Sequence, residues 1–443
     1  MEGQQPRRSK GRWYILALIC LMYLITYLDR VNISAAAPII SKEYGFDKIT
    51  MGAIFSAFVW AYALFQVPGG WLSDRFGARP VIGTIVAYWS VMTAATAAAT
   101  GAMSFIVLRF LFGIGEAGAF PGATRSMQLW YPREERGFVQ GLTHSASRLG
   151  AAIAPPLVVF IMSIWGWRSV FYVCGVFGFV WSIWWYLSYR NLPEEHPLVN
   201  QEELKHIRGV DGTGAIKPAF IERKAASVPW STLLRSPNMW AIMCAYFTYV
   251  YCLWIFLSWL PSYLFEFRHF TLVKVGLFAS MPLFAGVIGD TVGGLATDWL
   301  LKKTGNTKLA RRSVAIVGLL GCCSFIVPAA LTANATTAIY CLTASMFFLE
   351  CTIGPSWAVP MDAGGKYSGT VSGMMNMAGN FGGALSPLVF GFLVQYGNWQ
   401  APFIVAAVLL VIGAGVWAFW LDPNRSVLEG AAEASPAHLE QGA

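Results

Sequence analysis

Twelve long apolar segments, separated by short polar loops, constrain the fold of this chain more than any other feature of its sequence. A helix needs about 20 apolar residues to cross a hydrocarbon core of roughly 30 Å. Segments of this kind span residues 14–40, 50–73, 80–99, 103–126, 137–163 and 168–189, and then 239–264, 272–300, 312–332, 336–360, 367–394 and 397–421. The pattern predicts an all-α membrane protein with twelve transmembrane helices.

The composition agrees with this interpretation. Of the 443 residues, 56% are hydrophobic and only 12% are charged, whereas soluble domains carry about 25% charged residues. The 19 tryptophans suit a protein that anchors aromatic rings at membrane interfaces. The net charge of +8 comes from basic residues in short loops between apolar segments, so we expect no nucleic-acid partner, because such partners need clustered basic surfaces.

The basic residues also predict an orientation. They gather in the N-terminal segment, in the loops around Arg75 and Arg133, in the central polar stretch and around Lys308, and they are sparse in the alternate loops. Cytoplasmic loops carry the excess of Lys and Arg. We therefore expect both termini in the cytoplasm and a multi-pass protein of the bacterial inner (plasma) membrane.

The two halves of the sequence resemble each other. Gly150-x4-Pro155 matches Gly382-x4-Pro387 at an offset of 232, and Glu116-x4-Pro121 matches Glu350-x4-Pro355 at 234. This duplication predicts two pseudo-symmetric six-helix bundles with a substrate site near the midplane. The expected bounds are 1–189 for the first bundle, 190–237 for a cytoplasmic linker, 238–422 for the second bundle and 423–443 for a disordered cytoplasmic tail.

The loop after the second segment carries the motif that is most informative about family. It reads Gly70-Trp-Leu-Ser-Asp74-Arg75-Phe-Gly77-Ala-Arg79, with Pro80 where a second basic residue is common, and it resembles the signature loop of the major facilitator superfamily. The resemblance implies the major facilitator fold. It also implies a charge cluster that holds one conformation, for which the expected gating residues are Asp74, Arg75, Arg79 and Asp298.

Further motifs narrow the resemblance. Tyr27-Leu-Asp29-Arg30-Val-Asn32, Arg109-x6-Glu116-Ala-x2-Phe120-Pro121 and Phe256-Leu-Ser-Trp259-Leu-Pro261 look like the anion:cation symporter family. That family includes bacterial galactonate- and glucarate-type transporters. The resemblance implies proton-coupled symport of a small organic anion, with an aldonate, aldarate or hexuronate as the expected sugar-acid substrate.

Four ionisable residues at membrane depth are the candidates for this chemistry, because charge there is costly and marks ion or substrate paths. Asp29 and Glu116 are the expected proton acceptors, with Arg109 as their partner, since Arg109 and Glu116 are seven residues apart and share a helix face. Arg30 is expected to bind the substrate carboxylate with its two-pronged guanidinium. A fixed buried ion pair is the alternative role for these residues.

Polar side chains that match substrate-facing positions of the sugar-acid transporters form the rest of the predicted binding site. They are Tyr27, Tyr62, Gln66, Ser147, Trp357 and Asn376. Aromatic residues at helical spacing also occur as packing residues, so packing is the alternative role for Tyr27, Tyr62 and Trp357.

Arg148 and Glu350 depart from the galactonate-type pattern by adding a buried base and a buried acid. One interpretation is an ion pair that closes one conformation. The other is that Arg148 binds a second substrate carboxylate and favours a dicarboxylate, with Glu350 as an additional titrating group. Both residues are included in the predicted substrate site.

Other functional classes fit less well. The five histidines show no grouping that would serve a metal centre or a nucleophile, so we expect neither an enzyme nor a metal site, and no cofactor besides the proton as coupling ion. A uniporter or exchanger of organic anions remains an alternative, as do a carrier of aromatic or dicarboxylic acids and coupling to sodium. The expected partners are the anion, protons and the lipid bilayer, and we expect a functional monomer.

Overall fold

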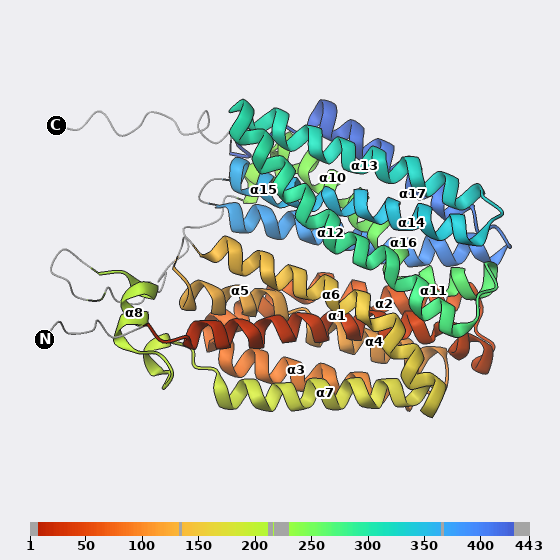
Figure 1. The fold of residues 1–443 in the computed structure, drawn as a ribbon, viewed down its shortest axis with the longest axis horizontal. Coiled ribbons are helices and arrows are strands. Elements are labelled where there is room, and N and C mark those ends of the chain that lie inside the picture. Colours follow the sequence, from red (N-terminus) through yellow and green to blue (C-terminus); the bar gives the residue numbers. More distant parts are fainter. Residues whose placement is uncertain (1–7, 133–134, 211–215, 217–229, 365–366, 429–443) are drawn as a thin grey trace, which may run out of the picture. The chain divides into compact units, whose positions relative to one another are not determined.

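The computed structural model describes residues 8–132, 135–210, 216, 230–364 and 367–428, and its long elements are all helices (Figure 1). The extended structure described in these ranges is a single bridge between Val210 and Ile216. Most of the predicted tail, much of the predicted linker and Arg133 lie outside the described residues.

Each of the twelve apolar segments contains helix. The first six correspond to α1 (Gly11–Tyr44), α2 (Lys48–Phe76), α3 (Ala78–Thr96), α4 (Ala102–Glu116) with α5 (Ala119–Trp130), α6 (Arg136–Trp165) and α7 (Trp167–Ser188). A short turn η1 (Pro193–Glu195), α8 (Gln201–Arg208) and α9 (Trp230–Arg235) follow in the polar stretch.

The second six segments repeat this order. They correspond to α10 (Pro237–Ser258) continued by α11 (Leu260–Ser262) and η2 (Tyr263–Phe267), α12 (Leu272–Thr304), α13 (Thr307–Leu331), α14 (Ala335–Cys351) with α15 (Ile353–Gly364), α16 (Ser368–Gln395), and α17 (Ala401–Gly415) with η4 (Val416–Trp420). Within the described ranges, eleven of the twelve segments are long and apolar enough to cross a membrane. The exception is α3, which has 19 residues and carries Thr84, Ser90 and Thr93 among its apolar side chains.

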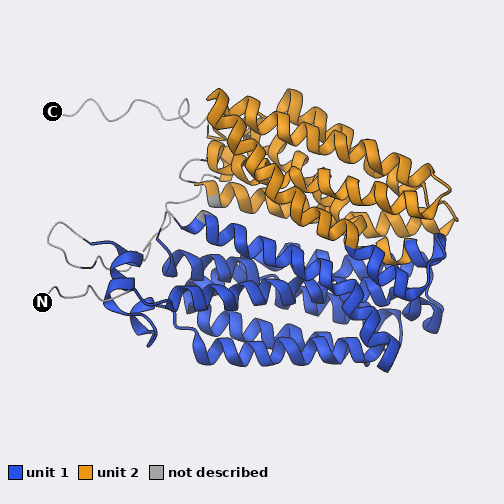
Figure 2. Ribbon diagram, viewed as in Figure 1, with its two compact units in different colours: residues 1–223, 264–280 blue, residues 224–263, 281–443 orange. Residues whose placement is uncertain are grey.

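The helices form two compact units (Figure 2). Unit 1 comprises residues 1–223 and 264–280, and unit 2 comprises residues 224–263 and 281–443. The segment 264–280 therefore packs with the first half of the sequence although it belongs to the second. An ion pair between Lys48 and Glu266 holds it there, and Gly276 lies against the side chain of Val159.

Equivalent glycines allow a close helix crossing in each unit. A Cβ atom at Gly150 of α6 would collide with the backbone carbonyl of Leu24 in α1, and a Cβ at Gly382 of α16 would lie 2.6 Å from the carbonyl oxygen of Phe247 in α10. Only glycine permits such an approach. These are the two glycines that the sequence duplication aligns, so the internal repeat marks the same packing contact in both units.

Two helices are interrupted at equivalent places. The fourth apolar segment breaks between Glu116 of α4 and Ala119 of α5. The tenth apolar segment breaks between Cys351 of α14 and Ile353 of α15. Proline follows each break, at Pro121 and at Pro355, and it cannot donate the hydrogen bond that would continue the preceding turn. Each break places a carboxylate, Glu116 or Glu350, at the end of the first half-helix.

The helix α8 of the polar stretch is docked onto the start of α1. The fully buried carboxylate of Glu203 accepts hydrogen bonds from the backbone N–H groups of Gly11 and Arg12 at 3.0 and 3.1 Å, and from the hydroxyl of Ser9. These N–H groups have no partner inside the helix, and the positive end of the helix dipole favours a carboxylate. Glu203 is therefore an N-terminal cap supplied from about 190 residues away in the sequence.

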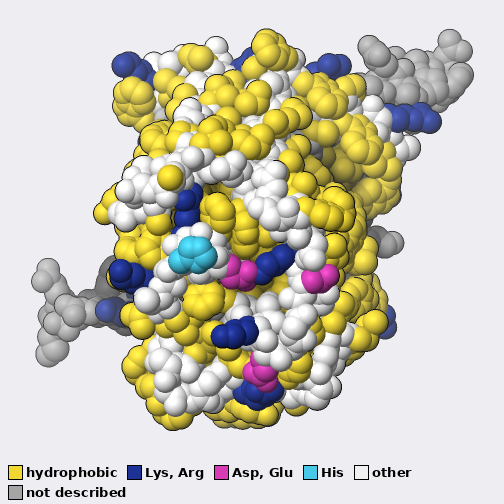
Figure 3. Space-filling view, turned by 90° about the vertical axis from the view of Figure 1, so that its right-hand side faces the viewer, with side chains coloured by type: hydrophobic (Ala, Val, Ile, Leu, Met, Phe, Trp, Pro, Cys, Tyr) yellow, Lys and Arg dark blue, Asp and Glu magenta, His cyan; other side chains and the backbone are white. Residues whose placement is uncertain are grey.

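The protein surface carries large apolar side chains along the helices. On α7, the side chains of Val176, Val180, Ile183 and Leu187 are 64%, 58%, 48% and 65% exposed, and their spacing places them along one helix face. At the end of the molecule shown in Figure 3, charged side chains of both signs and a histidine lie among apolar and uncharged ones. An apolar exposed stripe of this length suits contact with lipid rather than with water.

The Glu203 cap can be tested by substitution. We expect Glu203→Gln to lower the free energy of unfolding by about 2 kcal/mol, because hydrogen bonds to a charged group contribute that much. Glu202→Gln is the matched control, because Glu202 lies on the same helix and pairs with exposed Lys205 of that helix. Thermal unfolding in detergent measures both variants. Equal melting temperatures for the two variants would show that the cap contributes no stability.

Candidate functional site

The centre of unit 1 contains a buried ion pair between Arg30 of α1 and Glu116 at the end of α4. The Nε of Arg30 donates to Oε1 of Glu116, and the two side chains are 6% and 0% exposed. From the sequence we expected Arg109 as the partner of Glu116. Arg30 forms the pair because it reaches Glu116 across the contact between α1 and α4, a relation that spacing along α4 alone does not reveal.

Aromatic rings surround the Arg30 guanidinium. Its central carbon lies 4.5 Å from the ring centroid of Tyr62, 4.7 Å from that of Tyr27 and 5.5 Å from that of Phe120. These rings exclude water, and interactions between charges are stronger where water is excluded. Tyr27 and Tyr62 thus lie beside Arg30 and contact its charge with their ring faces. This enclosure therefore strengthens the ion pair that Arg30 forms with Glu116.

Asp29 lies next in the sequence but in a different environment. Its side chain is fully buried, and neither carboxylate oxygen makes a hydrogen bond of ordinary geometry to the described residues. Trp89 and Cys174 lie beside the carboxylate. Arg109 donates to the backbone carbonyl of Asp29 at 3.5 Å. Asp29 and Glu116 therefore sit in one polar cluster with two arginines, and within this cluster it is Glu116 that closes an ion pair.

Arg148 and Ser147 of α6 approach the same cluster. The guanidinium of Arg148 is 5.7 Å from the ring centroid of Tyr27, so Arg30 and Arg148 both contact Tyr27. Ser147 donates to the backbone carbonyl of His144 at 2.6 Å, which ties its hydroxyl to its own helix. Gln66 is half-buried on α2. Unit 1 thus brings together two arginines that could each bind one acidic group of a ligand.

Unit 2 places the remaining predicted residues on α14, α15 and α16. Glu350 is fully buried and accepts a hydrogen bond from the hydroxyl of Tyr249 at 3.0 Å. Trp357 donates its indole N–H to the hydroxyl of Tyr246 at 3.1 Å. Asn376 is half-buried, and its backbone carbonyl accepts from Asn380 at 2.9 Å.

Sequence reasoning missed the two tyrosines of α10. Tyr246 and Tyr249 stack with their ring centroids 5.4 Å apart, and each holds one predicted site residue, Trp357 or Glu350. The signal that could have found them is their spacing of three residues on one helix face. This spacing did not single out the two tyrosines, because the segment is rich in aromatic residues and any of several rings could face the core.

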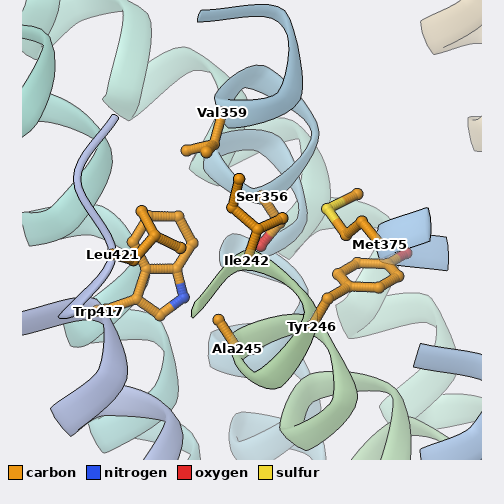
Figure 4. A pocket seen from close by; sticks show the side chains of 8 residues that line it. All are labelled: Ile242, Ala245, Tyr246, Ser356, Val359, Met375, Trp417 and Leu421. Atoms are coloured by element: carbon orange, nitrogen blue, oxygen red, sulfur yellow. The ribbon is translucent and has the colours of Figure 1, made fainter. Parts of the chain in front are cut away.

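A small pocket in unit 2 lies beside these residues but is not a ligand site. Tyr246, Ser356, Met375 and Trp417 are among its lining side chains (Figure 4). It leaves no room for a water molecule. Ser356 and Met375 directly precede Trp357 and Asn376 in the sequence, so the pocket is a packing gap next to the predicted site residues and cannot hold a substrate.

The two predicted gating acids lie in ion pairs near the helix ends, whereas the two predicted gating arginines contact a backbone carbonyl and an aromatic ring. Asp74 is 3.7 Å from Arg125, and Asp298 is 3.2 Å from Arg311, which also binds Asp362 at 3.2 Å. Arg79 donates to the backbone carbonyl of Tyr186 at 2.9 Å, and the guanidinium of Arg75 lies 5.2 Å from the Trp71 ring.

Three members of these contacts were missed at the level of sequence, namely Arg125, Arg311 and Asp362. Arg311 is one of the basic residues around Lys308, and a single arginine near a helix end has the same appearance as ordinary orienting charge. The acid in each unit nevertheless pairs with an arginine of its own unit, so each unit carries a separate charge cluster.

The chain matches known proteins along most of its length. Residues 19–387 and 365–442 match the family model of the Major Facilitator Superfamily. The chain is 44% identical to the probable sulfoacetate transporter SauU of Cupriavidus necator, over 92% of this chain and 93% of that one. It is 34% identical to the D-galactonate transporter of Escherichia coli, over 91% of this chain and 94% of that one.

The fold has solved counterparts. A bacterial homolog of the human lysosomal transporter Spinster superposes with a TM-score of 0.75 at 18% identity, over 94% of this chain and 97% of that one. This likeness confirms the fold expected from the sequence, and the family match and relatives confirm the predicted kinship with sugar-acid-type carriers.

The buried pair of Arg30 and Glu116 makes a stability prediction. We expect Glu116→Leu to lower the free energy of unfolding by about 3 kcal/mol, because it leaves the Arg30 charge buried without its partner. The double variant Arg30→Leu/Glu116→Leu should recover most of the loss, since both charges are then gone. Unfolding of the purified variants in detergent measures the cycle. Additive losses would show that the two side chains do not interact.

Proposed function

Since this chain belongs to the Major Facilitator Superfamily, we propose that it carries a small organic anion across the membrane in symport with protons, by alternating access. Its relatives are named as transporters of small organic anions, and its helices make it a multi-pass membrane protein. The observation that carries the proton-coupled form of the proposal is the buried pair of Arg30 and Glu116.

The pair couples anion binding to proton uptake by competition. Without substrate, Glu116 pairs with the guanidinium of Arg30. A substrate carboxylate or sulfonate that binds Arg30 replaces Glu116 as the partner of this guanidinium. An ionised carboxylate buried without a partner is costly. Protonation of Glu116 removes this cost, so anion binding and proton uptake occur together. Release of the anion returns Arg30 to Glu116 and expels the proton.

Asp29 supplies a second proton position. Its carboxylate is fully buried, makes no hydrogen bond of ordinary geometry to the described residues and lies near the Arg109 side chain. A proton on Asp29 removes the cost of burying its charge, so this residue can load from one side and unload to the other as the surrounding helices move. Arg109 holds the backbone of Asp29 and in this scheme keeps the carboxylate next to the substrate site.

The preferred substrate is an organic anion with two acidic groups. Arg30 and Arg148 both contact the Tyr27 ring, at 4.7 and 5.7 Å from its centroid, so a short dianion can meet both guanidinium groups. A sulfonate-carboxylate such as sulfoacetate, the substrate in the name of the 44% identical relative, has this form. An aldarate also has two acidic groups, whereas galactonate has one.

The same proposal covers the setting of the protein. Positive charge in alternate loops favours cytoplasmic termini in a bacterial inner membrane. Transport needs no residue from another copy of the chain in this scheme, so a monomer suffices. Facilitated uniport or anion exchange is the competing function, because the arginines alone explain anion binding.

Proton coupling can be separated from anion binding with Glu116→Gln. In reconstituted liposomes with an imposed pH gradient and sulfoacetate as the probe, we expect this variant to lose gradient-driven accumulation while it retains counterflow exchange, because glutamine cannot release a proton. Glu43→Gln, which removes a carboxylate paired with Arg168 at a helix end, is the control and should accumulate normally. Accumulation unchanged in Glu116→Gln would rule out the proton role of Glu116.

The second acidic group can be tested with Arg148→Gln. We expect uptake of sulfoacetate and glucarate to fall about 10- to 100-fold, because a charge-assisted hydrogen bond contributes roughly 1.5–3 kcal/mol. Galactonate uptake should change much less. Competition assays with the three anions on the same proteoliposomes give the ratio. Equal losses for all three would count against a second anion-binding position at Arg148.

A further inference from the structure

An open groove runs over the surface of unit 2 between α12, α13 and α14. Its volume is about 250 Å³, and Val292, Ala296, Val317, Phe347 and Cys351 are among the residues that line it. Val292 and Val317 are 42% and 60% exposed, so no described part of the chain covers the groove. All three helices belong to segments that are long and apolar enough to cross a membrane.

The chemistry of the lining limits what can fill the groove. Its side chains are apolar apart from Ser313, whose hydroxyl donates to the carbonyl of Leu309. A buried water needs several polar partners, and a soluble polar ligand would lose its hydrogen bonds here. A flexible hydrocarbon chain fits such a surface without that cost.

The groove continues into basic charge along α12. Val292, Ala296, Trp299 and Lys303 follow one another at intervals of four, three and four residues, so they share one helix face. The ammonium group of Lys303 lies 4.9 Å from the Trp299 ring centroid. Lys302 and Lys303 are exposed, and neither forms an ion pair with the described part of the chain. Their charges are available to a ligand.

The dimensions agree with one leaflet of a bilayer. The eleven residue steps from Val292 to Lys303 advance about 16 Å along the helix axis, close to half of a hydrocarbon core of roughly 30 Å. Tryptophan and lysine at the end of an apolar stretch are typical of the membrane interface. A molecule whose hydrocarbon chain fills the groove would place its polar end at Trp299 and Lys303.

We propose that the α12–α14 groove binds one anionic phospholipid. Its acyl chain lies along Val292, Ala296 and Val317, and its phosphate meets Lys302 and Lys303. Cys351 in the wall directly follows Glu350 at the break between α14 and α15. The bound chain therefore packs against the interrupted helix of unit 2.

Retention of lipid by the purified full-length protein tests the proposal. Phosphatidylglycerol and phosphatidylcholine with identical acyl chains are added to the protein in detergent, and bound lipid is counted by native mass spectrometry. We expect wild type to retain phosphatidylglycerol preferentially. Lys302→Gln/Lys303→Gln should weaken this retention about fivefold per lysine, since one basic residue near an anionic headgroup contributes about that factor.

Two matched controls separate the groove from general lipid affinity. Lys10→Gln/Lys42→Gln removes two exposed lysines elsewhere and should retain lipid like wild type. Val317→Trp fills the groove and should abolish preferential retention, whereas Val180→Trp, at a 58% exposed position on α7, should not. The proposal would be overturned if wild type retained the two lipids equally. It would also be overturned if Lys302→Gln/Lys303→Gln or Val317→Trp retained phosphatidylglycerol as well as wild type does. Melting temperatures near that of wild type establish that each variant is folded.

Discussion

A hydrocarbon layer offers no water to a backbone N–H or C=O group, so a chain that crosses it must satisfy these groups within each segment. This constraint accounts for the continuous helices of both units and makes the two interruptions informative. The helical segments that contain Glu116 and Glu350 are interrupted at the same point of the internal repeat. An interrupted helix at membrane depth is tolerated where protein packs around it, and it frees a short stretch of chain next to a buried acid.

The two units have diversified around that shared break. In unit 1 the acid faces a permanent positive charge, because Glu116 pairs with Arg30. In unit 2 the equivalent acid, Glu350, accepts a hydrogen bond from the hydroxyl of Tyr249. The repeated break thus has a different donor beside its acid in each unit, a guanidinium beside Glu116 and a tyrosine hydroxyl beside Glu350.

Most of the architecture could be predicted from the sequence because it depends on local properties. Apolar length predicts the helices, and the spacing of glycine, proline and acid predicts the repeat. Relations between helices were less accessible. The pairing of Arg30 with Glu116, the support of Glu350 and Trp357 by Tyr249 and Tyr246, and the link from Arg311 to Asp362 depend on how helices are rotated against one another. No periodicity within a single helix determines that rotation.

The capping of α1 by Glu203 changes how the connection between the halves should be viewed. With α8 fastened to the first turn of α1, the polar stretch up to Arg208 belongs mechanically to the first half of the protein. The covalent tether that joins the halves is then only the chain from Gly209 to the residue before Trp230, which is less than half of the predicted linker of residues 190–237. A chain divided within this shorter tether would keep the cap in the same fragment as the helix that it stabilises.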